Sequence, residues 1–180
     1  MKHRIVIATG NKDKMREVRE IFADLDAEIL SMKEAGCEAD PEENGTTFAE
    51  NAMIKAEAVH ALCPDAIVMA DDSGLVVDYL NGEPGIWSAR WLGRDTPYSV
   101  KNAEIIRRLE GVEGDARSAR FTAAIACILP DGRRFTTTAN MLNMNDNILL
   151  LLIQNDIQIL FLLKFVVYKN LYHSYLLDKI

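Results

Sequence analysis

The first 140 residues alternate between short apolar runs and amphipathic segments, which is the pattern of an α/β domain. The run from Arg4 to Ala8 is short and rich in β-branched residues, so it predicts a strand. A Gly/Asn turn follows, and residues 14–22 then carry apolar side chains at helical spacing. Those side chains belong to Met15, Val18, Ile21 and Phe22.

The next part of the chain predicts a second strand over Glu28 to Ser31 and a second helix that starts at Thr47. Thr47 and Glu50 have the spacing of a capping box, and Pro64 ends the helix. One face of this helix is expected to be buried. It consists of Phe48, Ala52, Ala56, Val59 and Leu62.

Two strand-like runs, 66–70 and 75–79, follow with Asp-Asp-Ser-Gly between them. Residues 99–109 predict a third helix, and residues 121–129 and 135–138 predict a hairpin around Pro-Asp-Gly. The expected fold is therefore α/β, with a central sheet and flanking helices. The expected inner face of the third helix consists of Val100, Ala103, Ile106 and Leu109.

The composition changes abruptly near residue 140, and residues 141–180 contain no Gly, Pro, Ala, Arg, Glu, Thr, Cys or Trp. We therefore expect an α/β domain over 1–140 and an atypical apolar tail over 141–180. Ile148 to Val167 raises the question of a membrane span. Asp156 interrupts it, and a central Asp costs about 2.5–3.5 kcal/mol on insertion, so no membrane partner is expected.

The net charge of −7 argues against broad binding to nucleic acid or to anionic membranes. The three cysteines are far apart in the sequence and show no metal-ligand spacing, so they are interpreted as free thiols in a reducing compartment. The apolar run near the N-terminus is too short for a signal peptide. A cytoplasmic protein is expected.

The turn from Ala8 to Lys14 lies where a strand ends and a helix begins. Backbone N–H groups at a helix start, a glycine, and the charges of Lys12 and Lys14 suit a phosphate group. The spacing matches neither the P-loop nor the dinucleotide fingerprint. The alternative is an ordinary strand-to-helix turn with exposed lysines.

Asp71 and Asp72 are adjacent carboxylates at the end of an apolar run. Because strand side chains alternate between faces, only one of them is expected to enter a given cleft, while the other serves the scaffold. A magnesium ion is a candidate partner for the one that enters. The alternative is a hairpin turn that uses Asp, Ser and Gly for its geometry.

Glu43 precedes the second helix and could supply another metal oxygen, and Lys55 on that helix is available to face a site. A solvated acidic loop before a capped helix is the alternative, but it leaves Asn51 and Lys55 unexplained. Arg90, in a later Gly/Pro-rich stretch, suits either a phosphate or a surface ion pair.

Four ordered motifs carry a resemblance: ATGNKDKMREV, ENGTTFAENAMIKA, ADDSGLVVDYLNGEPGIWSAR and ARFTAAIACILPDG. They resemble the Ham1-like family of non-canonical purine nucleoside triphosphate pyrophosphatases over about Arg4 to Thr138. The resemblance implies a mixed sheet with a cleft between two lobes, a homodimer, and Mg²⁺-dependent hydrolysis of dITP, ITP or XTP to the monophosphate and pyrophosphate.

The resemblance also implies roles for individual residues. Glu43 and Asp72 match metal ligands, and Asp72 also matches the proton acceptor for the attacking water. The residues that match substrate contacts are Thr9, Gly10, Asn11, Lys12, Asp13, Lys14, Lys55 and Ser73.

After Thr138 the family pattern continues with Phe-Gly-Tyr-Asp-Pro and Ser-His-Arg, which hold the purine base, and neither occurs here. The second lobe is therefore expected to be incomplete. We interpret the tail as the product of a frameshift, a disrupted gene or a gene-model error, with a genuine replacement as the alternative. Two other functions stay open, namely an inactive family member with residual phosphate binding and an interaction protein that uses its tail.

Overall fold

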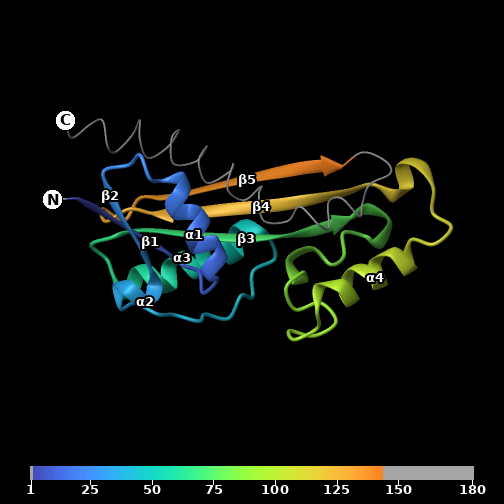
Figure 1. Ribbon diagram of the computed structural model, residues 1–180, viewed down its shortest axis with the longest axis horizontal. Coiled ribbons are helices and arrows are strands. Elements are labelled where there is room, and N and C mark those ends of the chain that lie inside the picture. The colour runs from blue at the N-terminus through green and yellow to red at the C-terminus, as the bar shows by residue number, and fades with distance from the viewer. Residues whose placement is uncertain (1, 144–180) are drawn as a thin grey trace. The chain divides into compact units, whose positions relative to one another are not determined.

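The computed structural model describes residues 2–143, which form a five-stranded sheet with helices beside it (Figure 1). The order of strands across the sheet is β2-β1-β3-β4-β5. The strands are β1 (His3–Ile7), β2 (Ala27–Ser31), β3 (Ile67–Val77), β4 (Ala119–Ile128) and β5 (Arg134–Asn143), and the helices are α1 (Lys12–Ile21), α2 (Met32–Ala35), α3 (Phe48–Leu62) and α4 (Tyr98–Arg108).

The sheet is mixed. Strand β1 pairs in parallel with β2 on one side and with β3 on the other. Strands β4 and β5 are sheet neighbours joined by a short turn, in which Leu129 and Arg133 are hydrogen-bonded, so they run antiparallel. The expected α/β class, the central mixed sheet and the 121–138 hairpin are thereby confirmed.

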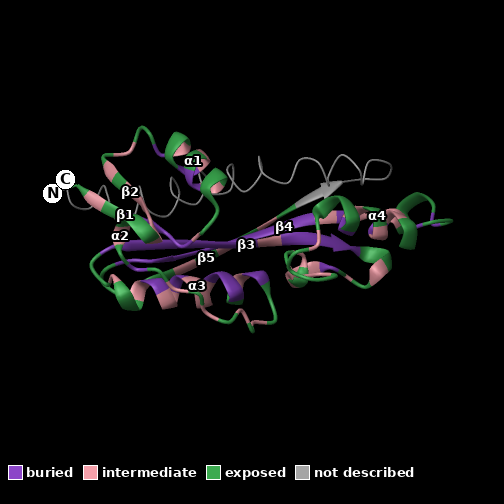
Figure 2. Ribbon diagram, turned by 60° about the horizontal axis from the view of Figure 1, so that its bottom comes forward, coloured by how far each residue is buried: buried purple, intermediate pink, exposed green. Residues whose placement is uncertain are grey.

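The described chain divides into two compact units. The first contains residues 2–72 and 124–138, and the second contains 73–123 and 139–143. In the first unit, α1 and α3 cover opposite faces of the sheet (Figure 2). Even-numbered residues of β1 and β3 pack against α3 in one apolar cluster that includes Val6, Val68, Ala52, Ala56 and Val59.

The three helices α1, α2 and α3 of this unit begin at side chains that accept hydrogen bonds from their first turn. Thr47 Oγ1 accepts from the Glu50 N–H at 3.1 Å, as the capping spacing predicts. The Glu50 carboxylate accepts from the N–H and the hydroxyl of Thr46 at 2.6 and 2.8 Å. Leu62 was expected on the buried face but is 57% exposed, because it lies in the last turn of α3, at the edge of the sheet-facing stripe.

The expectation of two strands separated by a turn at Asp71 to Gly74 is wrong, because β3 runs unbroken from Ile67 to Val77. Gly74 is required for packing in the second unit. A Cβ on Gly74 would lie 2.4 Å from Ser88 Oγ and 2.5 Å from the Gly85 carbonyl oxygen. Ser88 Oγ donates to that carbonyl at 2.6 Å and accepts from the Leu75 N–H at 3.0 Å. The glycine therefore serves a close approach and not a turn.

Helix α4 exists where the sequence predicts it, but its inner face is different. Val100 and Ala103 are exposed, whereas Lys101, Ile105 and Leu109 are buried. Lys101 tolerates burial because its amino group donates to the Ala89 carbonyl at 2.7 Å. Apolar periodicity could not identify a buried lysine.

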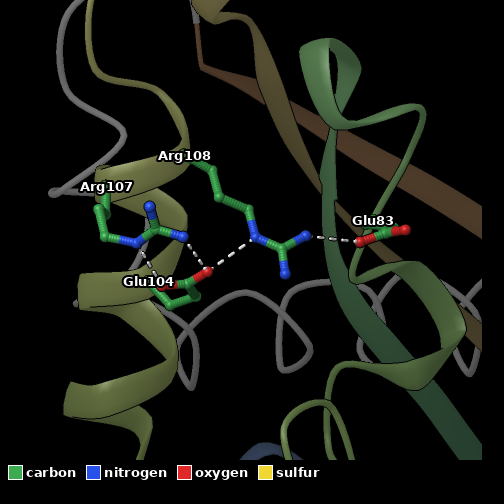
Figure 3. A network of polar contacts seen from close by, with 4 residues as sticks. All are labelled: Glu83, Glu104, Arg107 and Arg108. Carbon is green, nitrogen blue, oxygen red and sulfur yellow. Dashed lines mark hydrogen bonds and ion pairs between the residues drawn. The ribbon is translucent and has the colours of Figure 1, made fainter.

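An exposed charge network joins α4 to Glu83, which lies in the loop that follows β3 (Figure 3). The Glu104 carboxylate accepts two hydrogen bonds from Arg107 and one from Arg108, which also pairs with Glu83 at 3.2 Å. Hydrogen bonds from Arg107 and Arg108 lower the pKa of Glu104 to about 2. These groups are solvated, so we assign the network little stability.

Strand β5 extends to Asn143, three residues beyond the expected domain boundary at 140. The remainder of the predicted tail, including Ile148 to Val167, lies outside the described residues. Among residues 2–143, no helix has both the length and the apolarity needed to cross a bilayer.

Two of the three cysteines, far apart in the sequence, meet in the first unit. Cys63 at the end of α3 and Cys37 after α2 have their Sγ atoms 3.1 Å apart, and all three cysteines are free thiols. Burial raises the pKa of Cys63 to about 12, together with a hydrogen bond to Cys37 and electrostatic repulsion from Cys37. The Cys63 thiol is therefore protonated at neutral pH. The two sulfur atoms are placed to form a disulfide once an oxidant acts on them.

Diamide, which takes one hydrogen from each of two thiols, should convert Cys37 and Cys63 into a disulfide. Titration of thiols in the denatured chain should then fall from three groups to one. A Cys37→Ser variant should keep both of its thiols under the same treatment. Retention of all three thiols in the wild-type chain would contradict the proximity of the pair.

Candidate functional site

The predicted phosphate-binding turn follows the carboxyl end of β1 and lies beside Met69, in the first half of the parallel strand β3. From β1 the chain passes through α1 to β2, which lies on one side of β1. Strand β3, which comes later in the chain, lies on the other side of β1, so the strand order changes direction at β1. In open α/β sheets, ligands bind in the crevice at such a switch point. The Ala8 N–H donates to the Met69 carbonyl at 2.7 Å, which brings the turn against β3.

Thr9 and Asn11 shape this turn from within. Asn11 is the N-cap of α1, and its Oδ1 accepts from the N–H groups of Asp13 at 2.8 Å and Lys14 at 3.3 Å. The Asn11 N–H in turn donates to Thr9 Oγ1 at 3.2 Å. Since Asn11 already satisfies two N–H groups of the first turn, the expectation that they point to a phosphate does not hold in this conformation.

Gly10 is not explained by packing. A Cβ at Gly10 would meet no atom within 4 Å. Gly10 also lines a cavity of about 240 Å³ in the first unit. The predicted site residues in the lining of that cavity are Thr9, Gly10, Lys14, Glu43 and Lys55, and Asp71 lines it as well.

Lys14 projects from the first turn of α1 to Asp71, and its Nζ lies 2.5 Å from Asp71 Oδ2. The Lys14 side chain is 26% exposed and that of Asp71 9%. Of the two adjacent carboxylates, Asp71 lines the cavity and Asp72 is not among its lining residues. Lys14 and Asp71 are 57 residues apart in the chain, so only the tertiary fold brings them together.

Lys55 brings together the other two predicted acidic residues. Its Nζ lies 3.2 Å from Glu43 Oε1 and 3.6 Å from Asp72 Oδ1. The three side chains come from a loop, helix α3 and strand β3, so only the tertiary fold could place them together. Asp72 therefore faces α3 whereas Asp71 faces α1, which confirms the predicted alternation of the two carboxylates.

Asp72 has the most perturbed environment of the site. Burial raises its pKa above the ordinary 3.8, the positive charge of Lys55 partly offsets this effect, and the negative charges of Glu43 and Asp71 reinforce it. Asp72 Oδ2 is buried and accepts no hydrogen bond within the described part of the chain. A carboxylate with a raised pKa and an unused oxygen is suited to accept a proton or to bind a cation.

Five of the predicted residues are not among those that line this cavity, namely Asn11, Lys12, Asp13, Asp72 and Ser73. Lys12 lines a second cavity of about 460 Å³ on the side of Met15 and Arg19. Asp13 is exposed and pairs with Arg16 at 3.1 Å. Ser73 follows Asp72 in β3 and is the first residue of the second unit, so its role stays a prediction.

A buried polar residue of the site, Asn51, has no role assigned to it by the sequence motifs. Asn51, in the first turn of α3, is fully buried and precedes Lys55 by four residues, so both lie on one face of the helix. That spacing, together with a polar residue on an otherwise apolar face, is the signal that could have identified it.

A model of the Ham1 family matches residues 5–142, and the chain belongs to this family. It is 42% identical over 125 residues to the dITP/XTP pyrophosphatase of Caldanaerobacter subterraneus, a match that covers 69% of this chain and 62% of that protein. It is 41% identical over 136 residues to the dITP/XTP pyrophosphatase of Clostridium perfringens, covering 73% and 67%. The chain thus spans about two thirds of the length of these curated relatives.

Solved structures of the family have the same fold. The Staphylococcus aureus Ham1 protein matches with a TM-score of 0.69 and 34% identity, over 78% of this chain and 71% of that one. A HAM1 protein from Coxiella burnetii matches with a TM-score of 0.71 and 30% identity, over 79% and 72%. The resemblance seen in the four motifs is therefore confirmed at the level of family and fold.

The variant Asp72→Asn is expected to raise the melting temperature at pH 7. Since folding raises the pKa of Asp72, its charged form is less favourable in the folded state than in the unfolded state. This penalty is fully present above the raised pKa and disappears as the pH falls toward the ordinary value of 3.8. Thermal unfolding followed by circular dichroism across this pH range measures the difference.

The matched control is Asp78→Asn in the second unit, which should show the opposite sign. A hydrogen bond from Ser118, and then the charge and hydrogen bond of Arg120, lower the pKa of Asp78. This carboxylate therefore stabilises the fold at neutral pH, and its contribution is lost on acidification. A melting temperature of Asp72→Asn at or below wild type at pH 7 would contradict the account.

Proposed function

We propose that this chain hydrolyses non-canonical purine nucleoside triphosphates, namely dITP, ITP and XTP, to the monophosphate and pyrophosphate. The observation that carries the proposal is the cavity lined by Lys14, Lys55, Glu43 and Asp71, with Asp72 Oδ1 at 3.6 Å from Lys55 Nζ. Relatives that share more than 40% of their residues with this chain over the matched regions are dITP/XTP pyrophosphatases. Both lysines are paired with carboxylates, and a triphosphate would compete for them.

Magnesium fits the donor set of this site. Among residues 2–143, no group of three or more His, Cys, Asp or Glu side chains is arranged to hold a metal by itself. Mg²⁺ commonly uses only one or two carboxylates and takes its other ligands from water and substrate phosphates. Glu43 Oε1 and Asp72 Oδ1 already lie around one positive charge, the Lys55 amino group, which a cation would replace.

When bound, Mg²⁺ would neutralise charge on the phosphate oxygens. The chain's own residues have three tasks. Lys14 and Lys55 bind the negatively charged phosphates and orient them. Gly10 leaves space for the triphosphate to approach the backbone. Asp72 positions a water and accepts its proton, as its raised pKa favours. The water oxygen bonds to the α-phosphorus, the bond from that phosphorus to the bridging oxygen breaks, and pyrophosphate leaves.

We also propose that the protein acts in the cytoplasm on free nucleotides, as a homodimer, and without a nucleic-acid or membrane partner. The acidic net charge of −7 supports the choice of free nucleotides over nucleic acid. Gel filtration with light scattering would establish whether the chain dimerises.

An inactive family member is the second candidate, because the matches cover 62% and 67% of the two curated relatives. Residual phosphate binding without turnover would distinguish this candidate from the first. The lysine–carboxylate pairs support phosphate binding in either case.

The assay is pyrophosphate release from dITP, XTP, dATP and dGTP, with and without Mg²⁺. The wild-type chain should require Mg²⁺ and prefer dITP and XTP. Asp72→Asn should lower kcat/KM by about 10²-fold or more, since proton transfer to a positioned base contributes about 10²–10⁴-fold. Asp78→Asn, which lies in the second unit, should retain activity.

The positive control is the dITP/XTP pyrophosphatase of Clostridium perfringens under identical conditions. If that enzyme is active and this chain releases no pyrophosphate while remaining folded, the first candidate is wrong. Binding of pyrophosphate in that case would support the inactive family member.

A further inference from the structure

Asn51 is a fully buried amide at the centre of the candidate site. It occupies the inner face of α3, with Ala52 beside it in the chain and Lys55 one turn further along. A side-chain amide has one acceptor and two donor positions, and a buried amide ordinarily uses both ends. The two ends of Asn51 have different surroundings.

The oxygen end fixes the loop that carries Glu43. Asn51 Oδ1 accepts from the Gly45 N–H at 2.9 Å. A Cβ on Gly45 would lie 2.7 Å from this oxygen and 2.8 Å from Glu50 Cβ, so glycine is required for the approach. Because Glu43 is two residues before Gly45, this contact sets the distance of the Glu43 carboxylate from Lys55.

The nitrogen end lies near Asp72 without a hydrogen bond. Asn51 Nδ2 and Asp72 Oδ2 are both buried, and neither has a hydrogen-bond partner in the described part of the chain. The Asn51 side chain is nevertheless close enough to lower the pKa of Asp72. A buried donor and a buried acceptor, both unsatisfied and close together, need only a small movement to pair.

We propose that Asn51 is a positioning residue that holds Glu43 and Asp72 at the spacing that a divalent cation requires. Its Oδ1 fixes the Glu43 loop, and its Nδ2 donates to Asp72 Oδ2, which leaves Asp72 Oδ1 for a cation that displaces the Lys55 amino group. This inference rests on the proposed function for its role in turnover, but its effect on cation binding is independent of turnover.

The test uses Asn51→Leu, which keeps the number and branching of the side-chain heavy atoms and removes both polar ends. The matched control is Ala52→Gly, which weakens the same helix turn without touching the amide. The probe is Mn²⁺, whose affinity for the nucleotide-free chain is measured by electron paramagnetic resonance below the melting temperature of each variant. Asn51→Leu should weaken Mn²⁺ binding by about 10-fold or more, and Ala52→Gly should stay close to wild type.

A second readout separates positioning from substrate binding. In the dITP assay, Asn51→Leu should lower kcat by about 10–100-fold with a much smaller change in KM. If Asn51→Leu does not fold, Asn51→Ser, with room for a water beside its hydroxyl, is measured in the same way. Circular dichroism establishes folding.

The outcomes distinguish this inference from the proposed function. Equal effects of Asn51→Leu and Ala52→Gly on Mn²⁺ affinity would overturn the positioning role even in an active enzyme. Undetectable Mn²⁺ binding by the wild-type chain would overturn it as well. Weakened Mn²⁺ binding in Asn51→Leu, in a chain that releases no pyrophosphate, would support the positioning role and contradict the proposed function.

Discussion

The structure depends on how one strand accommodates two adjacent negative charges. Asp71 and Asp72 lie within the continuous strand β3, and both are buried. Buried carboxylates are costly unless a cation or hydrogen bonds compensate them. Strand geometry sends the two side chains to opposite faces, where Lys14 from α1 meets Asp71 and Lys55 from α3 meets Asp72. One helix on each face of the sheet therefore supplies the lysine that compensates one of the two carboxylates.

The local sequence places each lysine for this purpose. The Asn11 cap begins α1 so that Lys14 falls in its first turn, and the Thr47 cap begins α3 so that Lys55 falls on the face toward the sheet. The two pairs are not equivalent. Lys14 contacts Asp71 at 2.5 Å, whereas Lys55 is shared between Glu43 and Asp72 at 3.2 and 3.6 Å. Partly buried ion pairs add little net stability, so we interpret them as charges fixed in place for a ligand.

The sequence predicts the parts of the fold that depend on local signals. The strand over Arg4 to Ala8, both capped helices and the 121–138 hairpin follow from periodicity and turn residues. It mispredicts β3, because Asp-Asp-Ser-Gly has the composition of a turn although Gly74 is needed for packing against Ser88. It also mispredicts the inner face of α4, where the buried residue is Lys101.

The residues of the candidate site also fall into two groups, those that a local motif predicts and those that only the tertiary structure reveals. Thr9 to Lys14, Glu43, Lys55 and Asp72 were identified by motif, and the structure brings Lys14, Glu43 and Lys55 to one cavity. The contribution of Asp71 to the wall and the contacts of Asn51 depend on distances between segments far apart in the chain. No pattern within a single segment encodes them.

The most direct test is a crystal structure of this chain with Mn²⁺ and a dITP analogue whose α,β-bridging oxygen is replaced by a methylene group. The account predicts anomalous density bonded to one oxygen each of Glu43 and Asp72, with the amino groups of Lys14 and Lys55 on the phosphates. Triphosphate density elsewhere, with Lys14 still on Asp71 and Lys55 still between Glu43 and Asp72, would contradict it.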